Sequence, residues 1–230
     1  MIQSHFNRRL SARIVLSLFV FAAIALPIGN AQGKSSQPTA LEIAKRVDEH
    51  YNHLQSLKAA FNEQYEGLGM HRSESGTMFL RKPGRMRWEY QNTQGKVFVL
   101  DGKFAWFYSP GQSQIQRIPA SQLDDLRSPL RFLLGHTKIE SELTGLALAS
   151  TDGGNFTLTG VPKGQQKRIS KLSLTVTATG TITAISIEEV DGARTTFAFT
   201  GEEANATIPE SQFHFSPPPG VPVVDALPPV

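Results

Sequence analysis

Groups that could do acid–base or metal chemistry are few and scattered in this chain. It has 230 residues, with six histidines and no cysteine. His50 and His53 are three residues apart and could share one face of a helix, but no third ligand is near them in sequence. A solvated helix surface is the commoner setting for such a pair. The adjacent acidic pairs at 124–125 and 188–189 are poor partners for general acid–base catalysis, because neighbouring side chains diverge in helices and strands.

The motifs of common exported hydrolases are absent from the sequence. It contains no Gly-x-Ser-x-Gly elbow, no His-Glu-x-x-His zinc helix and no Gly-x-x-x-x-Gly-Lys phosphate loop. We therefore predict no metal, nucleotide or redox cofactor, and we expect no enzymatic activity. An exported hydrolase with a non-standard site stays open as an alternative.

Residues 79–108 offer a different chemistry, the binding of an apolar ligand. This stretch contains both tryptophans of the chain. Met86, Trp88 and Tyr90 alternate with charged residues, so on a strand they share one apolar face. Such a face could be packed core or could line a cavity in a large curved sheet, and periodicity does not separate the two. The candidate cavity residues are Phe79, Leu80, Met86, Trp88, Tyr90, Phe98, Leu100 and Trp106.

A helix is predicted ahead of this stretch, over residues 39–57. Thr39 and Glu42 have the spacing of a capping box. The apolar residues that follow recur every three or four positions and form one stripe, which must lie on an apolar surface. They are Leu41, Ala44, Val47, Tyr51 and Leu54.

After residue 57 the apolar period changes from that of a helix to that of strands. Short alternating runs are joined by turns such as Asp101-Gly102 and Asp191-Gly192. About 10–11 antiparallel strands are expected, and a sheet of this size curls towards a barrel. The predicted fold is mostly β (α+β): an incomplete antiparallel half-barrel closed by the N-terminal helix and a helical lid. One or two short helices are expected within residues 119–148, with Gly135 as a C-cap.

The N-terminal stretch predicts a secretory signal peptide. Three arginines precede an apolar run at residues 14–28, and small residues follow at 29–31. An uncleaved anchor is disfavoured because the run of about fifteen residues is shorter than the roughly 20 that span a bilayer. We predict cleavage after residue 31 and one exported domain over 32–230, in the periplasm of a Gram-negative cell. Its proline-rich tail, 217–230, could be loose or packed at an edge.

Charge and cysteine content exclude two kinds of association. The chain has 23 basic and 20 acidic residues, and three of the basic ones lie in the predicted signal peptide, which leaves 20 of each. With no global basic field, nucleic acid is not an implied partner. Without a cysteine, the exported chain cannot carry the lipid anchor of a bacterial lipoprotein, and we expect it to be soluble. A local basic patch at 81–87 could steer an acidic receptor or be a solvated strand face.

Four segments, in this order, resemble the outer-membrane lipoprotein carrier protein LolA family. Residues 80–90 are similar to its basic-Pro-Gly segment that ends at an Arg-Trp pair, and 100–110 to its Asp-Gly-Lys hairpin. Residues 128–134 are similar to its lid helix, and 213–221 to its C-terminal Phe-x-Phe-x-Pro-Pro-x-Gly-Val segment. Each segment alone is weak, but together they cover about residues 40–225 behind a predicted signal peptide.

The resemblance implies a monomeric periplasmic chaperone whose apolar interior holds the acyl chains of lipoproteins. An inner-membrane ABC transporter would release the cargo, and a LolB-like outer-membrane receptor would accept it. Lys82 stands where the family usually has an arginine that latches the lid, and Met86 where it usually has an aromatic residue. The implied lid residues are Leu130, Phe132, Leu133 and Leu134.

Two further functions remain open beside the carrier and the hydrolase. A lipid-sensing regulatory domain of the same fold would usually carry a second domain, for which 230 residues leave little room. A static structural or adhesion module would have a filled core and would bind no lipid.

Overall fold

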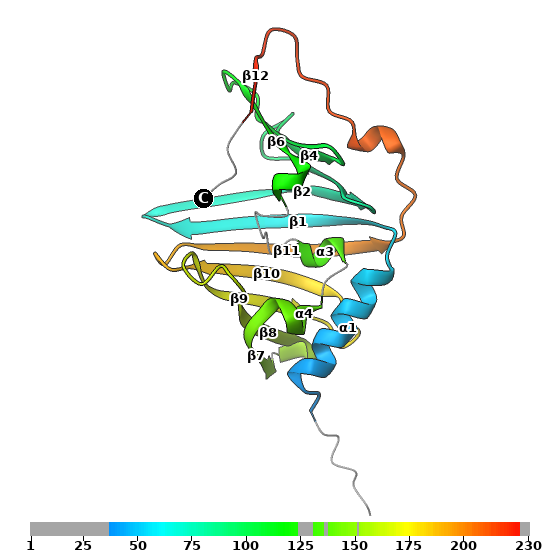
Figure 1. The fold of residues 1–230 in the computed structure, drawn as a ribbon, viewed down its shortest axis with the longest axis vertical. Helices are drawn as coiled ribbons and strands as arrows, with labels where there is room; N and C mark the ends of the chain where they lie inside the picture. The colour runs from blue at the N-terminus through cyan, green and yellow to red at the C-terminus, as the bar shows by residue number, and fades with distance from the viewer. Residues whose placement is uncertain (1–36, 124–130, 136–137, 151, 226–230) are drawn as a thin grey trace, which may run out of the picture. The chain divides into compact units, whose positions relative to one another are not determined.

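Most of the chain folds into one open sheet, whose strand order is β12-β6-β5-β4-β3-β2-β1-β11-β10-β9-β8-β7 (Figure 1). The computed structural model describes residues 37–123, 131–135, 138–150 and 152–225. The predicted mostly β fold is confirmed: the 12-stranded sheet is not closed, and β7 and β12 are its edges. The strands are β1 (Ser56–Gly67), β2 (Met70–Arg81), β3 (Arg85–Tyr90), β4 (Val97–Asp101), β5 (Phe104–Tyr108), β6 (Ile115–Pro119), β7 (Leu143–Ser150), β8 (Phe156–Pro162), β9 (Ile169–Val176), β10 (Ile182–Glu189), β11 (Arg194–Ala204) and β12 (Val223–Asp225).

Sequential hairpins build this sheet, and two long-range pairings complete it. Strands β1 and β11 pair antiparallel in the middle, with Phe61 opposite Phe199, and join the two halves. β12 pairs parallel with β6 at one edge, with Val223 opposite Ile115. The turn at Asp191-Gly192 is confirmed, since Gly192 takes a positive φ of 89° between β10 and β11.

Helix α1 (Ala40–His53) crosses one face of the sheet (Figure 1). It begins with the predicted capping box: the Thr39 hydroxyl accepts from the Glu42 backbone N–H at 3.2 Å, and the Glu42 carboxylate accepts from Thr39 N–H at 2.7 Å. The short helices α3 (Arg131–Leu134) and α4 (Ile139–Glu142) contact α1 on the same face. We call the helix-covered face the inner face. Two other short helices are α2 (Ala120–Leu123) and η2 (Glu210–Phe213), and η1 (Asp152–Gly154) is a single 3₁₀ turn.

The main core lies between the inner face and these helices. It contains Ile43, Val47 and Tyr51 of α1, which are almost fully buried, together with side chains from ten of the strands, all except β6 and β12. A second, smaller cluster lies on the outer face and consists of Val97, Val99, Trp106 and Ile115, with Phe104, Tyr108, Phe215 and Val221 against it. Among the described residues, no helix is long and apolar enough to cross a membrane.

Three sequence predictions about the elements were wrong. The first helix ends at His53, not at 57, because Leu57 fits both periods and belongs to β1, opposite Leu80. The helical insertion predicted within 119–148 contains most of strand β7, whose alternation is interrupted by Gly145, with a positive φ of 68° at a register shift. No strand forms at residues 213–215; the tail instead contributes β12.

Candidate functional site

Six of the eight candidate cavity residues lie together on the inner face. Leu80, Met86 and Leu100 are register partners across β2, β3 and β4, and all three are buried. Trp88, which is 2% exposed, is paired with Phe98 in the next strand. Phe98 and Tyr90 are only half-buried and pack against the margin of the core. The inner face therefore carries a continuous apolar layer with an aromatic margin.

Phe79 and Trp106 do not belong to this set and lie on the outer face. Phe79 is opposite Arg87 and next in sequence to inner-facing Leu80, so their side chains point to opposite sides of the sheet. Trp106 is opposite Val99 and packs in the outer cluster. Placing them in the cavity was wrong, because strand alternation turns both side chains away from the inner face.

The aromatic side chains that surround Trp88 come from other strands and are not among the predicted site residues. The Trp88 ring centroid is 4.5 Å from Phe61, 5.5 Å from Phe197 and 6.2 Å from Phe199. The ring of Phe107, on β5, packs against that of Phe98 in a tilted arrangement, with 4.9 Å between the centroids. Because β1 and β11 meet only through long-range pairing, nothing in the local sequence placed these rings beside Trp88.

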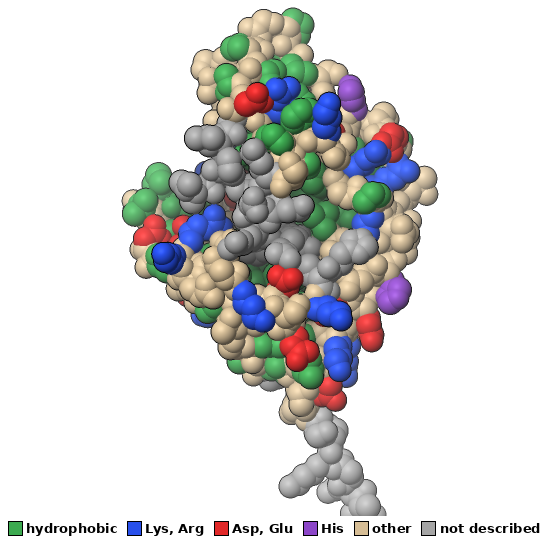
Figure 2. Space-filling view, in the orientation of Figure 1, with side chains coloured by type: hydrophobic (Ala, Val, Ile, Leu, Met, Phe, Trp, Pro, Cys, Tyr) green, Lys and Arg blue, Asp and Glu red, His purple; other side chains and the backbone are tan. Residues whose placement is uncertain are grey.

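The predicted lid lies over the inner face where the structure describes it. Phe132 and Leu133 of α3 are 3% and 1% exposed and belong to the core cluster, and Leu134 is half-buried against it. Leu130 lies outside the described residues. Figure 2 shows hydrophobic side chains at the surface on this helix-bearing face, among charged ones. The helices thus cover part of the apolar layer.

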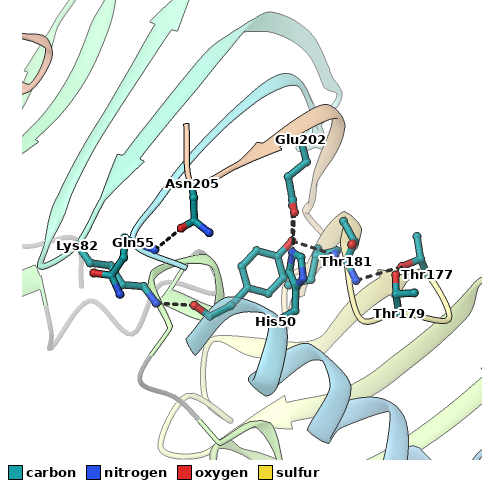
Figure 3. Close-up of polar contacts among 10 residues, drawn as sticks. His50, Gln55, Lys82, Thr177, Thr179, Thr181, Glu202 and Asn205 are labelled. Atoms are coloured by element: carbon teal, nitrogen blue, oxygen red, sulfur yellow. Dashed lines mark hydrogen bonds and ion pairs between the residues drawn. The ribbon is translucent and has the colours of Figure 1, made fainter. Parts of the chain in front are cut away.

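A partly buried hydrogen-bond network holds α1 to the sheet (Figure 3). The Tyr51 hydroxyl donates to the Glu202 carboxylate at 2.9 Å and accepts from the Ile182 N–H at 3.0 Å. His50 Nε2 lies 2.6 Å from the other Glu202 oxygen. Burial raises the pKa of Tyr51, so the phenol stays protonated and can donate. Tyr51 appeared in the sequence only as part of an apolar stripe, although a buried tyrosine predicts a partner for its hydroxyl.

Lys82, the predicted latch, forms hydrogen bonds to the C-terminal end of α1 (Figure 3). Its Nζ donates to the carbonyl oxygens of Tyr51 and Asn52, the latter at 3.2 Å. These carbonyls lie in the last turn, where helical acceptors lack backbone partners and a cation is favourable. Gly135 follows α3 with a φ of 70°, and a side chain there would meet Lys82 Nζ and the Tyr51 carbonyl. Lys82 thus lies between the ends of two covering helices.

Replacing Lys82 by methionine should loosen α1. The variant keeps the apolar stem but leaves the Tyr51 and Asn52 carbonyls without the ammonium. We expect the free energy of unfolding to fall by about 1–2 kcal/mol, with faster amide exchange in the last turn of α1. Lys82→Arg, which restores a cation and several donors, is the matched control. Unchanged exchange in Lys82→Met would show that the contact does not hold the helix.

Asp48 joins α1 to α4 through the backbone. Its carboxylate accepts from the Ile139 N–H, at 3.2 Å and 3.1 Å to its two oxygens. Burial raises the pKa of Asp48 to about 6, and the Ile139 N–H and Lys138 only partly oppose that shift. The ionised carboxylate is therefore less favourable in the folded chain than in the unfolded one.

This shift predicts a pH dependence of stability. Because the folded pKa of Asp48 lies above its ordinary value of 3.8, the folded chain binds the proton more tightly, and the contribution of Asp48 to stability falls as pH rises from about 4 to about 6. Asp48→Asn keeps an acceptor for Ile139 N–H but cannot titrate. Urea unfolding across this range should give a flatter profile for the variant. Identical slopes for the two proteins would contradict the assignment.

A charged cluster bounds the apolar layer towards the β1–β2 hairpin. Glu63 and Glu74 are register partners and are only 9% and 8% exposed. They form the next inward-facing pair after Phe61 and Gly76 in the direction of the hairpin turn. Lys96 Nζ lies 2.6 Å from both Glu74 oxygens and 4.3 Å from the Tyr90 ring centroid. Burial raises the pKa values of Glu63 and Tyr90. The charges are thus mutually compensated at the edge of the apolar layer.

The apolar cluster on the outer face is covered by the C-terminal segment of the chain. The Asp101 carboxylate accepts from the indole N–H of Trp106 at 2.7 Å and from two backbone N–H groups. Burial opposes these hydrogen bonds, but they prevail and lower the pKa of Asp101. Phe215 packs on Trp106 at 5.5 Å, and Asp225 of β12 pairs with Arg117 at 2.7 Å. The C-terminal segment therefore covers the outer side of β4–β6.

The basic patch at 81–87 is largely neutralised. Glu210 of η2 pairs with Arg81 at 2.8 Å and also with Arg85, and Arg87 pairs with Glu89 at 2.6 Å. No group of three or more potential metal ligands occurs among the residues that the structure describes. His50 contacts Glu202, and His53 Nδ1 lies 2.6 Å from the Glu49 carbonyl.

Comparison with known proteins confirms the predicted family resemblance. The model of the family "Outer membrane lipoprotein carrier protein LolA" matches residues 52–216. The chain is 28% identical over 190 residues to the outer-membrane lipoprotein carrier protein of Sodalis glossinidius, covering 82% of this chain and 90% of that one. The protein of the same name from Chromobacterium violaceum is 30% identical over 169 residues, covering 74% and 81%.

A solved structure supports the fold. An uncharacterized conserved protein from Thermus thermophilus superposes with a TM-score of 0.52 at 14% identity, covering 81% of this chain and 99% of that one. At this identity the likeness concerns the fold alone. The family model covers more than half of the residues and includes the inner-face strands and the lid position. The chain belongs to the outer-membrane lipoprotein carrier protein LolA family.

Proposed function

We propose that this protein is a periplasmic chaperone that binds the acyl chains of lipoproteins and carries them between the two membranes. The observation that carries the proposal is the apolar inner face, on which Trp88, Met86 and Leu100 lie beneath helices. Its relatives are named lipoprotein carriers, and acyl chains are the apolar part of such cargo. No enzymatic step is part of this function.

Access to the layer requires the covering helices to move. α1 is tied to the sheet by Tyr51 and Glu202, and its last turn is tied by Lys82. These are a few polar contacts rather than a covalent link, so cargo binding can offset their loss. Opening at α1 and α3 would expose Trp88 and its neighbours to an acyl chain, since both helices pack on the same core.

Energetics favour incomplete burial of the cargo. Moving an acyl chain out of water contributes up to ~0.8 kcal/mol per buried CH₂, so one long chain alone could contribute on the order of 12 kcal/mol. Complete burial of several chains would approach the practical limit of roughly 20 kcal/mol, and release would be too slow. Energy spent on displacing the contacts of Lys82 and Tyr51 would keep the cargo exchangeable.

The proposed route uses three partners and a cleaved export signal. The chain, cleaved after residue 31, would take acylated lipoproteins from an inner-membrane ABC transporter and pass them, as a monomer, to a LolB-like outer-membrane receptor. The predicted signal peptide and the carrier names of the relatives support this route. No nucleic acid or cofactor takes part.

Release from spheroplasts tests the proposal. Purified protein over residues 32–230 is added to spheroplasts that make a labelled lipoprotein, with and without ATP. We expect ATP-dependent appearance of the lipoprotein in the supernatant as a one-to-one complex. A parallel reaction with an authentic carrier is the positive control. Release by that control but not by this chain would overturn the carrier function.

A further inference from the structure

The indole N–H of Trp88 is a buried donor that lacks a partner among the described residues. Trp88 is 2% exposed, and its Nε1 has no hydrogen-bond acceptor in the part of the chain that the structure describes. The other tryptophan shows the usual solution, since Trp106 Nε1 donates to Asp101 at 2.7 Å. A buried unsatisfied donor costs free energy, and such groups in native proteins often have a functional explanation.

The described side chains around Trp88 offer its N–H no good acceptor. Its register partners are Met78 and Phe98, and the rings of Phe61, Phe197 and Phe199 surround it. Aromatic faces accept hydrogen bonds only weakly. A saturated hydrocarbon chain at this position would not satisfy the donor either. An acyl chain that carries its carbonyl to this point would.

We propose that Trp88 Nε1 donates a hydrogen bond to the ester or amide carbonyl of a bound acyl group, and so distinguishes acyl chains from plain alkyl chains. This inference rests on the proposed function, because it names the polar group that the inner face recognises. The cargo's carbonyls are neutral acceptors, which suit an uncharged donor in an apolar layer. Charged headgroups are not required, and Glu63 and Glu74 already have their counter-ions in Arg72 and Lys96.

Two matched lipids and two matched variants test the hydrogen bond. The probes are a monoacylglycerol and the alkylglycerol ether of the same length, in which a methylene replaces the ester carbonyl. Equilibrium dialysis measures each with the full exported chain, with Trp88→Phe and with Trp106→Phe. Phenylalanine keeps an aromatic ring but has no donor. The Trp106→Phe control removes the other indole N–H, which lies on the outer face.

The unsubstituted chain should bind the ester about 5- to 10-fold more tightly than the ether, as one hydrogen bond to a neutral acceptor allows. Trp88→Phe should bind the two lipids equally, whatever its overall affinity, and Trp106→Phe should keep the preference. If Trp88→Phe binds both lipids but still prefers the ester, the proposed hydrogen bond is wrong, while the carrier function stands. If no protein binds either lipid, the proposed function fails and this inference fails with it.

Discussion

Phe98→Glu should abolish cargo binding while leaving the protein folded. Phe98 is half-buried at the margin of the inner face, opposite Trp88 and 4.9 Å from the ring of Phe107. The half-exposed position lets a carboxylate reach water in the empty protein. A bound acyl chain would desolvate that carboxylate, so affinity for acylated cargo should fall by about 100-fold or more. Lipoprotein release from spheroplasts measures the loss.

Phe79→Glu is the matched control for Phe98→Glu. Phe79 is also half-buried, but it lies on the outer face between its register partners Lys58 and Arg87. A carboxylate there gains cationic neighbours and meets no cargo. We expect release within about twofold of the unsubstituted protein, since an exposed ion pair contributes little. Equal losses in the two variants would show that the faces do not differ in function.

Trp88→Ala should cause the largest loss of stability from one side chain. Trp88 is among the largest fully buried residues, and five aromatic or sulfur-containing neighbours contact it or pair with it. Removing the indole loses apolar burial and leaves a cavity, which typically costs about 3–5 kcal/mol. Urea unfolding of the unliganded protein measures the change.

A bound lipid should restore part of that stability. The cavity left by Trp88→Ala is lined by apolar groups, and such cavities take up apolar ligands. A ligand that binds only the folded state stabilises it by mass action. The alkylglycerol ether, which needs no donor, is the appropriate probe. A loss below about 1 kcal/mol in the unliganded variant would contradict the packing of the inner face.

Local sequence patterns predicted most of the helices and strands. They predicted few of the contacts between side chains that form the candidate site. The capping box at Thr39 and Glu42 fixed the start of α1, because both partners are three residues apart. Strand alternation placed Met86 and Trp88 on one face, and β3 has that pattern. These features depend on residues that are close in sequence, so a short segment of the chain is enough to predict them.

The missed features depend on pairings between distant segments. Tyr51 and Glu202 are 151 positions apart, and no local pattern relates them. The separation of Trp106 from the inner face depends on Asp101 and on Phe215, which arrives from the C-terminal segment. β7 was missed because a glycine bulge broke its period. The sequence thus indicates which residues are apolar, and the sheet register decides which of them face the cargo.

The central claim is that the inner face, and not the outer one, contacts the acyl chains. A photoreactive phenylalanine analogue placed at position 98 or at position 79 tests it directly, after loading with a lipoprotein whose acyl chains are radiolabelled. Irradiation should attach the label at position 98 and leave position 79 unlabelled. Labelling at position 79, or equal labelling at both, would contradict the assignment of the binding face.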